Sequence, residues 1–138
     1  MNVRVSTPLA KSSPVAGPSE SLRAATLDDI PLPLLVTGVA GVAGYNALRY
    51  FQQLYPYQVI GTRRADNWRL SGPGIAACDI HDRDAMRRLF DEYQFASVLH
   101  AEGTCKLKSC ELDPALARQV NVDGLANLLE NVSPETRL

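Results

Sequence analysis

Short apolar runs alternate with amphipathic stretches along residues 31–138. Four runs, at residues 34–37, 57–62, 75–78 and 97–99, have the length and the flanking turn residues of buried strands. Pro33 comes immediately before the first run, a position at which a strand tolerates proline. The pattern therefore predicts four short strands.

Between these runs, apolar residues recur at steps of three and four, the spacing that places side chains on one face of a helix. Pro56 ends the first such segment, while Asp82 and Asp113 stand where helix N-caps are expected. Pro114 then falls at the first turn of the last helix, where proline is tolerated. The predicted apolar faces are Gly41, Tyr45, Leu48, Phe51 and Tyr55; Met86, Leu89, Phe90 and Tyr93; and Ala117, Val120, Asn121, Gly124 and Leu128.

Strands that alternate with helices predict a parallel sheet joined by right-handed crossovers. The expected fold class is α/β, a doubly wound Rossmann-type sheet of about four strands in the order 3-2-1-4. The fourth strand would form an exposed edge of this sheet, and such edges normally have a neighbour. We therefore expect residues 31–138 to be an incomplete Rossmann-type domain, or one half of an assembly.

Residues 1–30 differ from the rest because serines and prolines replace the apolar periodicity. This composition predicts a disordered leader. A secretory signal is disfavoured because no apolar central region follows the basic start, and acidic residues such as Glu20 weaken the case for a transit peptide.

The bulk composition excludes several classes of function. Hydrophobic residues make up 46% of the chain and charged residues 21%, and the net charge is −1. Nucleic-acid binding is disfavoured because it requires a basic excess, and no apolar run is long enough to cross a membrane. The three cysteines, Cys78, Cys105 and Cys110, lack the spacing of a zinc site. We interpret them as free thiols of a cytoplasmic protein, whose oligomeric state stays open.

A glycine-rich turn carries the strongest functional signal. It follows the first predicted strand, opens the first helix and has the spacing G-x-x-G-x-x-G. Glycine allows a sharp turn and a close approach of backbone to a pyrophosphate, and the helix N-terminus attracts the phosphate charge. The alternative is a turn selected for packing alone. The residues expected to bind the dinucleotide here are Gly38, Val39, Ala40, Gly41, Val42, Ala43 and Gly44.

Two arginines follow the second predicted strand, where an acidic residue would select NAD. Arg63 and Arg64 instead suit the 2′-phosphate of NADP, through charge-assisted hydrogen bonds. NADP is therefore the expected cofactor, with NAD as the alternative because Asp66 is near. The alternative is that one or both arginines are solvated surface charges.

Three further positions follow the third and fourth strands or lie on the last helix. Asp79 is a candidate acceptor for the adenine amino group, or only a turn residue, and the neighbouring His81 is expected to be exposed. Small residues around Ala101 leave room for the nicotinamide half of the cofactor, a place where Glu102 is unexpected. Asn121 is expected to tie the last helix to the fourth strand, because buried polar groups need partners.

Together these segments resemble the extended short-chain dehydrogenase/reductase superfamily, of the epimerase/dehydratase type. The segment from Thr104 through Glu111, Asp113 and Asn121 is most similar to the dTDP-4-dehydrorhamnose reductase-like group. The resemblance implies that Gly38, Gly41 and Gly44 bind pyrophosphate, Arg63 and Arg64 the adenosine ribose, Asp79 and Ile80 the adenine side, and Ala101 the nicotinamide side. The matching segments are residues 36–44, 78–80, 98–101 and 113–122.

The superfamily's chemistry implies a Tyr-x-x-x-Lys pair on a later helix, and none of the five tyrosines here has a lysine four positions on. We therefore expect this chain to be the cofactor portion of a sugar-nucleotide reductase-like oxidoreductase, without the complete catalytic machinery, and to have a nucleotide-sugar as a further ligand. The alternatives are a noncatalytic NADP-binding regulatory subunit and a fragment of a nucleotide-sugar epimerase or dehydratase.

Overall fold

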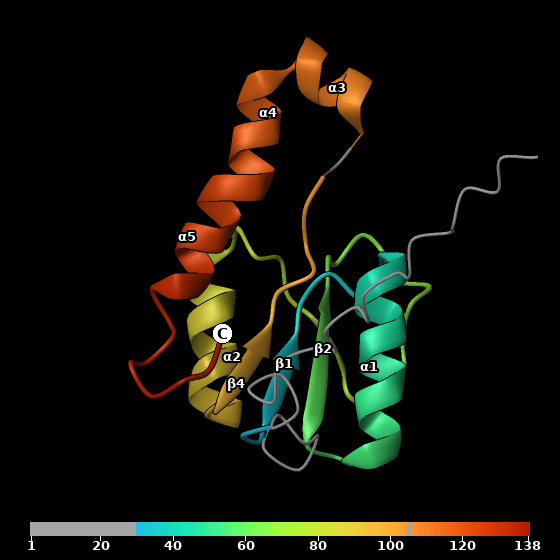
Figure 1. Cartoon of the computed structure of the whole chain (residues 1–138), viewed down its shortest axis with the longest axis vertical. Helices are drawn as coiled ribbons and strands as arrows, with labels where there is room; N and C mark the ends of the chain where they lie inside the picture. The colour runs from blue at the N-terminus through green and yellow to red at the C-terminus, as the bar shows by residue number, and fades with distance from the viewer. Residues whose placement is uncertain (1–29, 105) are drawn as a thin grey trace, which may run out of the picture.

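The computed structural model describes residues 30–104 and 106–138, so the leader expected at residues 1–30 lies almost wholly outside the described part of the chain. A parallel sheet forms the centre of the molecule (Figure 1). Its strands are β1 (Leu34–Val36), β2 (Val59–Arg63), β3 (Ile75–Ala77) and β4 (Ser97–Leu99). They run in the order β3-β2-β1-β4, which confirms the predicted order 3-2-1-4.

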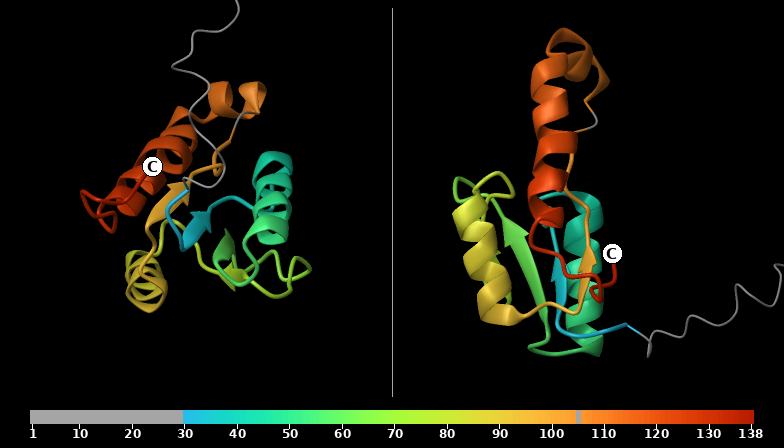
Figure 2. Two further views of the ribbon diagram at one scale, coloured as in Figure 1. Left: turned by 60° about the horizontal axis from the view of Figure 1, so that its bottom comes forward. Right: turned by 90° about the vertical axis from the view of Figure 1, so that its left-hand side faces the viewer.

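Helices cover both faces of this sheet, α1 (Val42–Leu54) on one side and α2 (Arg83–Tyr93) with α5 (Gly124–Leu129) on the other (Figure 2). Successive residues of a strand point to opposite faces, so β1 supplies both cores. Leu34 and Val36 pack with Leu48 of α1. Leu35 packs in the second core, whose members from α2 and α5 are Met86, Leu89, Phe90 and Leu128.

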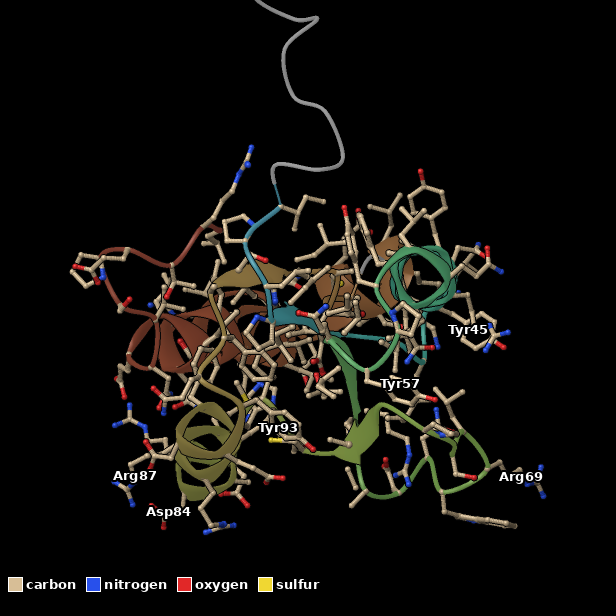
Figure 3. All side chains as sticks on the ribbon, turned by 90° about the horizontal axis from the view of Figure 1, so that it is seen from below. Tyr45, Tyr57, Arg69, Asp84, Arg87 and Tyr93 are labelled. Carbon is tan, nitrogen blue, oxygen red and sulfur yellow. The ribbon has the colours of Figure 1, made fainter. Side chains whose placement is uncertain are left out.

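The structure confirms the predicted helix N-caps and the predicted buried face of α2. Asp82 caps α2 by accepting a hydrogen bond from the backbone N–H of Ala85 at 2.9 Å. Asp113 caps α4 (Pro114–Arg118) in the same way, from Leu116 at 3.0 Å, with Pro114 in the first turn. The predicted face of α2 is also confirmed, and Asp84 and Arg87 lie on its outward side (Figure 3).

Three expectations about the elements were wrong in detail. β2 begins at Val59 because Tyr57 has a φ of 67° and is 96% exposed, which is incompatible with a buried strand. Tyr45, expected on the buried face of α1, points outward from it (Figure 3). A short helix missed by the pattern, α3 (Leu107–Leu112), precedes α4.

The last helical segment changes from an α-helix to a π-helix and back along its length. Between α4 and α5 lies a π-helical stretch, η3 (Gln119–Asp123). The α3–α4 end projects beyond the carboxyl ends of the strands (Figure 1). The predicted open edge of β4 is partly covered, because Val98 donates to the carbonyl of Arg137 at 2.8 Å and Arg137 donates to the carbonyl of Ala96 at 3.0 Å. The chain beyond α5 thus pairs with β4 in the parallel direction.

Candidate functional site

The carboxyl ends of the four strands meet at one edge of the sheet, because all four are parallel. The chain leaves β1 towards α1 on one face and enters β4 from α2 on the other, so a crevice is expected between the ends of β1 and β4. The turn that follows β1 begins at Thr37 and Gly38, and the segment that follows β4 begins at His100. The predicted glycine turn therefore lies at the switch point of the sheet.

Gly38 has a φ of 68°, a conformation that favours glycine. A Cβ atom there would stand 2.7 Å from the carbonyl oxygen of Ala101 and 2.7 Å from the backbone nitrogen of Glu102. A Cβ on Gly44 would collide with the carbonyl oxygen of Gly38. The turn after β1 is thus held against both β4 and the first turn of α1, with no room for side chains at these two positions.

The N-terminus of α1 is prepared for an anion. Gly41 is the N-cap and supplies no side-chain acceptor, and the first turn holds no acidic residue. The following side chains, Val42 and Ala43, are exposed. Unpaired N–H groups at the start of a 13-residue helix, together with its dipole, favour a phosphate group.

A cleft of about 280 Å³ opens beside this turn. It brings together six of the predicted site residues, from the glycine turn and from the segments that follow β2 and β4: Gly38, Ala40, Gly41, Arg63, Arg64 and Ala101. Four further residues complete its lining, namely Asp66, Asn67, Glu102 and Gly103. Asn67 was missed by the sequence reasoning, because nothing in the β2–β3 loop marks which residue turns back towards the glycines.

The two arginines have different surroundings. Arg63 folds back, and its Nη1 donates to the carbonyl of Arg64 at 2.9 Å and to that of Ala65 at 3.4 Å. Its buried Nε has no partner within the described chain. Arg64 has a side chain that is 61% exposed, with Nη2 3.1 Å from Asp66 Oδ2 and Nε 3.7 Å from Asp79 Oδ2. Arg64 is therefore the arginine that can turn towards a ligand.

Asp79 is held by His81 rather than standing free. Its Oδ1 accepts hydrogen bonds from the backbone N–H and from ring Nδ1 of His81, each at 3.0 Å. Burial by itself would raise the pKa of Asp79, but these donors and the nearby Arg64 outweigh it and lower the pKa. The second carboxylate oxygen faces Arg64, on the side of the cleft.

The expectation that His81 is exposed was wrong. Its ring is half-buried, with Nδ1 on Asp79 and Nε2 3.0 Å from the carbonyl oxygen of Gln119 in η3. Burial lowers the pKa of His81, yet the two acceptors together raise it above the ordinary value. The charged imidazolium can donate to both acceptors at once, whereas a neutral ring can donate to only one.

A second hydrogen-bonded group lies at the ends of β1 and β4. The hydroxyl oxygen of Thr37, which is fully buried, is 2.8 Å from His100 Nδ1 and accepts from the N–H of Ala101 at 3.1 Å. Burial lowers the pKa of His100. Thr37 was missed by the sequence reasoning, although a polar residue that ends a buried strand beside the glycine turn was a usable signal.

The remaining predicted residues surround the cleft without lining it. Val39 and Ile80 have side chains buried to 1% exposure in the two cores, so only their backbone could meet a ligand. Asn121 is exposed rather than buried, and its amide binds both the N–H and the carbonyl of Thr104, at 2.8 Å and 3.0 Å. It ties the last helix to the segment after β4, close to the expected role.

The described part of the chain holds neither a metal-ligand cluster nor a membrane-spanning helix. No group of three or more metal-ligating side chains occurs within residues 30–104 and 106–138. Over the same residues, the helices are too short or too polar for any of them to span a membrane.

Comparison with known proteins finds a family and a set of similar structures. The model of the NAD dependent epimerase/dehydratase family matches residues 34–135. No curated protein matches the chain.

Among solved structures, a monomeric L-threonine 3-dehydrogenase from a metagenome is 27% identical with a TM-score of 0.61, and the match covers 71% of this chain and 32% of that one. UDP-glucose 4-epimerase of Thermotoga maritima, solved with UDP-glucose, is 25% identical with a TM-score of 0.60, covering 71% and 33%. UDP-glucose 4-epimerase of Thermus thermophilus, a complex with NAD, is 27% identical with a TM-score of 0.59, covering 71% and 32%. The matched region spans about a third of the length of these structures.

Proposed function

Because this chain belongs to the NAD dependent epimerase/dehydratase family, we propose that its cleft binds a nicotinamide dinucleotide for an oxidoreductase or epimerase. The observation that carries the proposal is the cradle at Gly38. A Cβ atom there would stand 2.7 Å from the backbone after β4, beside the open N-terminus of α1. Such a turn lets a pyrophosphate approach the backbone closely. When bound, the nicotinamide ring supplies hydride chemistry, and the protein positions it.

The proposed site divides the dinucleotide among the strand ends. Gly38, Ala40 and Gly41 meet the pyrophosphate together with the N–H groups of Val42, Ala43 and Gly44. Arg63 and Arg64 border the adenosine ribose, and Asp79 with the backbone of Ile80 borders the adenine. Ala101 leaves space for the nicotinamide half.

We propose NADP in preference to NAD, and the argument rests on Arg64. Its guanidinium is paired with Asp66 across an exposed contact, and such a contact contributes little free energy, so a 2′-phosphate can displace it. Asp66 is the competing residue, since an acidic side chain there can bind the ribose hydroxyls of NAD.

The test compares dissociation constants of NADPH and NADH for the 138-residue chain. Trp68, the one tryptophan of the chain, lies next to the cleft residue Asn67 and reports binding by fluorescence. Arg64→Ala is expected to weaken NADPH binding by about tenfold, typical of losing one charge-assisted contact, and to leave NADH binding within about twofold. The matched control is Arg87→Ala, which removes an exposed arginine on the outward side of α2, away from both the cleft and Trp68 (Figure 3).

The outcomes separate the two parts of the proposal. Equal or tighter binding of NADH by the unchanged chain contradicts the preference for NADP. Failure to bind either dinucleotide contradicts the proposed site itself.

For the whole protein we propose a nucleotide-sugar as the second substrate, of the dTDP-4-dehydrorhamnose reductase type. The resemblance to that type rests on the segment from Thr104 to Asn121. Hydrogen bonds between Thr104 and Asn121 join the two ends of this segment, and Asp113 caps the helix within it. A UDP-glucose 4-epimerase with UDP-glucose is among the similar structures, so an epimerase is an equal candidate. Net oxidation of NADPH by a keto-sugar nucleotide would favour the reductase. Interconversion of nucleotide-sugars without net oxidation would favour the epimerase. Binding of the dinucleotide without any turnover would favour a noncatalytic regulatory subunit.

A further inference from the structure

Glu102 is a carboxyl group inside the cleft that is proposed to receive a pyrophosphate. It follows Ala101 after β4 and lines the cleft together with Gly38 and Arg64. Its backbone nitrogen and Cα are each 2.7 Å from the position of a Cβ on Gly38, so the residue directly borders the phosphate-binding turn.

The charges around Glu102 come from the ends of β2 and β3. Asp79 is the negative neighbour, whereas Arg64 and His81 are the positive ones. Arg64 is itself paired with Asp66, another carboxylate that lines the cleft, and Arg63 is occupied by backbone carbonyls. The buried Cys78 thiol lies near enough that the carboxylate helps to raise its pKa.

Burial is the main influence on the protonation of Glu102. It raises the pKa of the carboxyl group, and the negative charge of Asp79 raises it further, while His81 and Arg64 oppose this without reversing it. The cleft therefore favours the neutral form of the Glu102 carboxyl group more strongly than bulk water would.

We propose that Glu102 makes dinucleotide binding proton-linked: its neutral carboxylic acid admits the pyrophosphate, and its carboxylate opposes it. The inference rests on the proposed function. Two negative groups confined in one cleft repel each other, so a bound pyrophosphate favours protonation of Glu102 beyond what burial alone does. Binding then takes up a proton from the solvent, and affinity falls as the pH rises. The neutral acid also provides an O–H donor that a phosphate oxygen can accept.

The experiment is calorimetric titration of the 138-residue chain with NAD⁺ at several pH values between about 5 and 8, a range that begins just above the ordinary pKa of a glutamate. NAD⁺ is the probe because it lacks the 2′-phosphate, whose own titration near pH 6 would add protons to the balance. Repeating each titration in buffers of different ionisation enthalpy counts the protons taken up. Glu102→Gln is expected to bind about tenfold tighter at the upper end of the range, the effect of one pKa unit, and to lose most of the uptake.

Three variants isolate Glu102 from its neighbours. Asp84→Asn removes an exposed carboxylate on the outward side of α2, outside the cleft (Figure 3), and is expected to keep the proton uptake of the unchanged chain. His81→Gln removes the histidine that faces Glu102 and is expected to retain the part of the uptake that belongs to Glu102. Glu102→Ala repeats the main test with a side chain as small as that of Ala101, in case the glutamine variant does not fold.

The results test the role of Glu102 and the dinucleotide site separately. Binding of NAD⁺ with an unchanged proton count in Glu102→Gln and Glu102→Ala, or weaker binding by both at the upper end of the range, overturns the role of Glu102 and leaves the dinucleotide site standing. Absence of NAD⁺ binding at every pH overturns the proposed function and this inference with it.

Discussion

At the scale of single residues, the site is defined more by backbone than by side chains. Gly38 adopts a φ of 68° at the point where the β1–α1 turn touches the segment after β4. Gly41 has a φ of −87°, which any residue can adopt, and a Cβ there would lie 3.3 Å from the carbonyl oxygen of Gly38. Gly38 is therefore needed for the conformation of the turn on which the proposed site depends, whereas Gly41 is needed for direct access of a ligand to the backbone.

Gly38→Ala is expected to destabilise the fold by about 2 kcal/mol or more, because the left-handed conformation costs a residue with a Cβ about 1–2 kcal/mol before any collision. Gly41→Ala is the matched control and is expected to keep most of the stability but to bind dinucleotide more weakly. Urea denaturation measures the first effect and fluorescence titration the second. Equal stability of Gly38→Ala and the unchanged chain would contradict the cradle.

At the scale of elements, contacts distant in sequence join the strand ends to the last helical segment. His81 connects the end of β3 to η3 through Asp79 and the carbonyl of Gln119. Gly124, the first residue of α5, comes so close that a Cβ on it would be 3.2 Å from His81 Nε2. The last helix therefore packs against the edge of the sheet that carries the cleft, and the state of His81 influences that packing.

His81→Gln is expected to cost more stability at pH 6 than at pH 8. The pKa of His81 is raised in the folded protein, so its stabilisation is fully present below the ordinary value of 6.5 and is lost as the pH rises through the folded pKa. The difference is on the order of 1 kcal/mol, the contribution of a hydrogen bond. Urea denaturation of both proteins at both pH values measures it.

Two other groups must be separated from this effect. The lowered pKa of His100 acts in the opposite direction, because stability is lost as that half-buried ring is protonated. Subtracting the stabilities of the two proteins at each pH removes this contribution. Asp79 has a lowered pKa, so its contribution is lost only in acid below the ordinary value of 3.8. An equal cost of His81→Gln at pH 6 and pH 8 would show that the charged ring does not tie β3 to η3.

At the scale of the whole molecule, the proposed ligand would touch the segments that follow all four strands. Both cores meet at β1, which supplies Leu34 and Val36 to one and Leu35 to the other. The glycine turn continues from that strand, so binding at the turn is coupled to the integrity of both layers. A ligand held there stabilises the molecule as a unit rather than one loop.

A dinucleotide at one hundred times its dissociation constant is therefore expected to stabilise the chain by about 2.7 kcal/mol, through the preference of the ligand for the folded state. The rise in Tm, followed by circular dichroism over a series of NADPH concentrations, measures this. Inorganic pyrophosphate is the control, and we expect a smaller rise because it reaches only the glycine turn. A Tm that is independent of NADPH concentration would contradict binding to the folded chain.

The amino-acid sequence by itself determined the features that depend on neighbours along the chain. Alternating apolar runs and helical stripes predicted the four strands, their order and the faces of α2. The caps at Asp82 and Asp113 followed from residue type and position. The glycine turn was recognisable because Gly38 and Gly44 meet requirements of backbone geometry within a few residues of each other. Each of these signals is local, so periodicity and spacing record it.

Only the tertiary structure decided the polar partners within the site. Thr37 meets His100 across 63 positions of sequence, and His81 meets Gln119 across 38. It also decided that Arg63 folds onto the backbone while Arg64 stays available, and that Glu102 is half-buried beside the glycine turn. These arrangements depend on which strand ends the parallel sheet brings together. Burial and electrostatic interaction depend on distance in space, which residue type and spacing along the chain do not record.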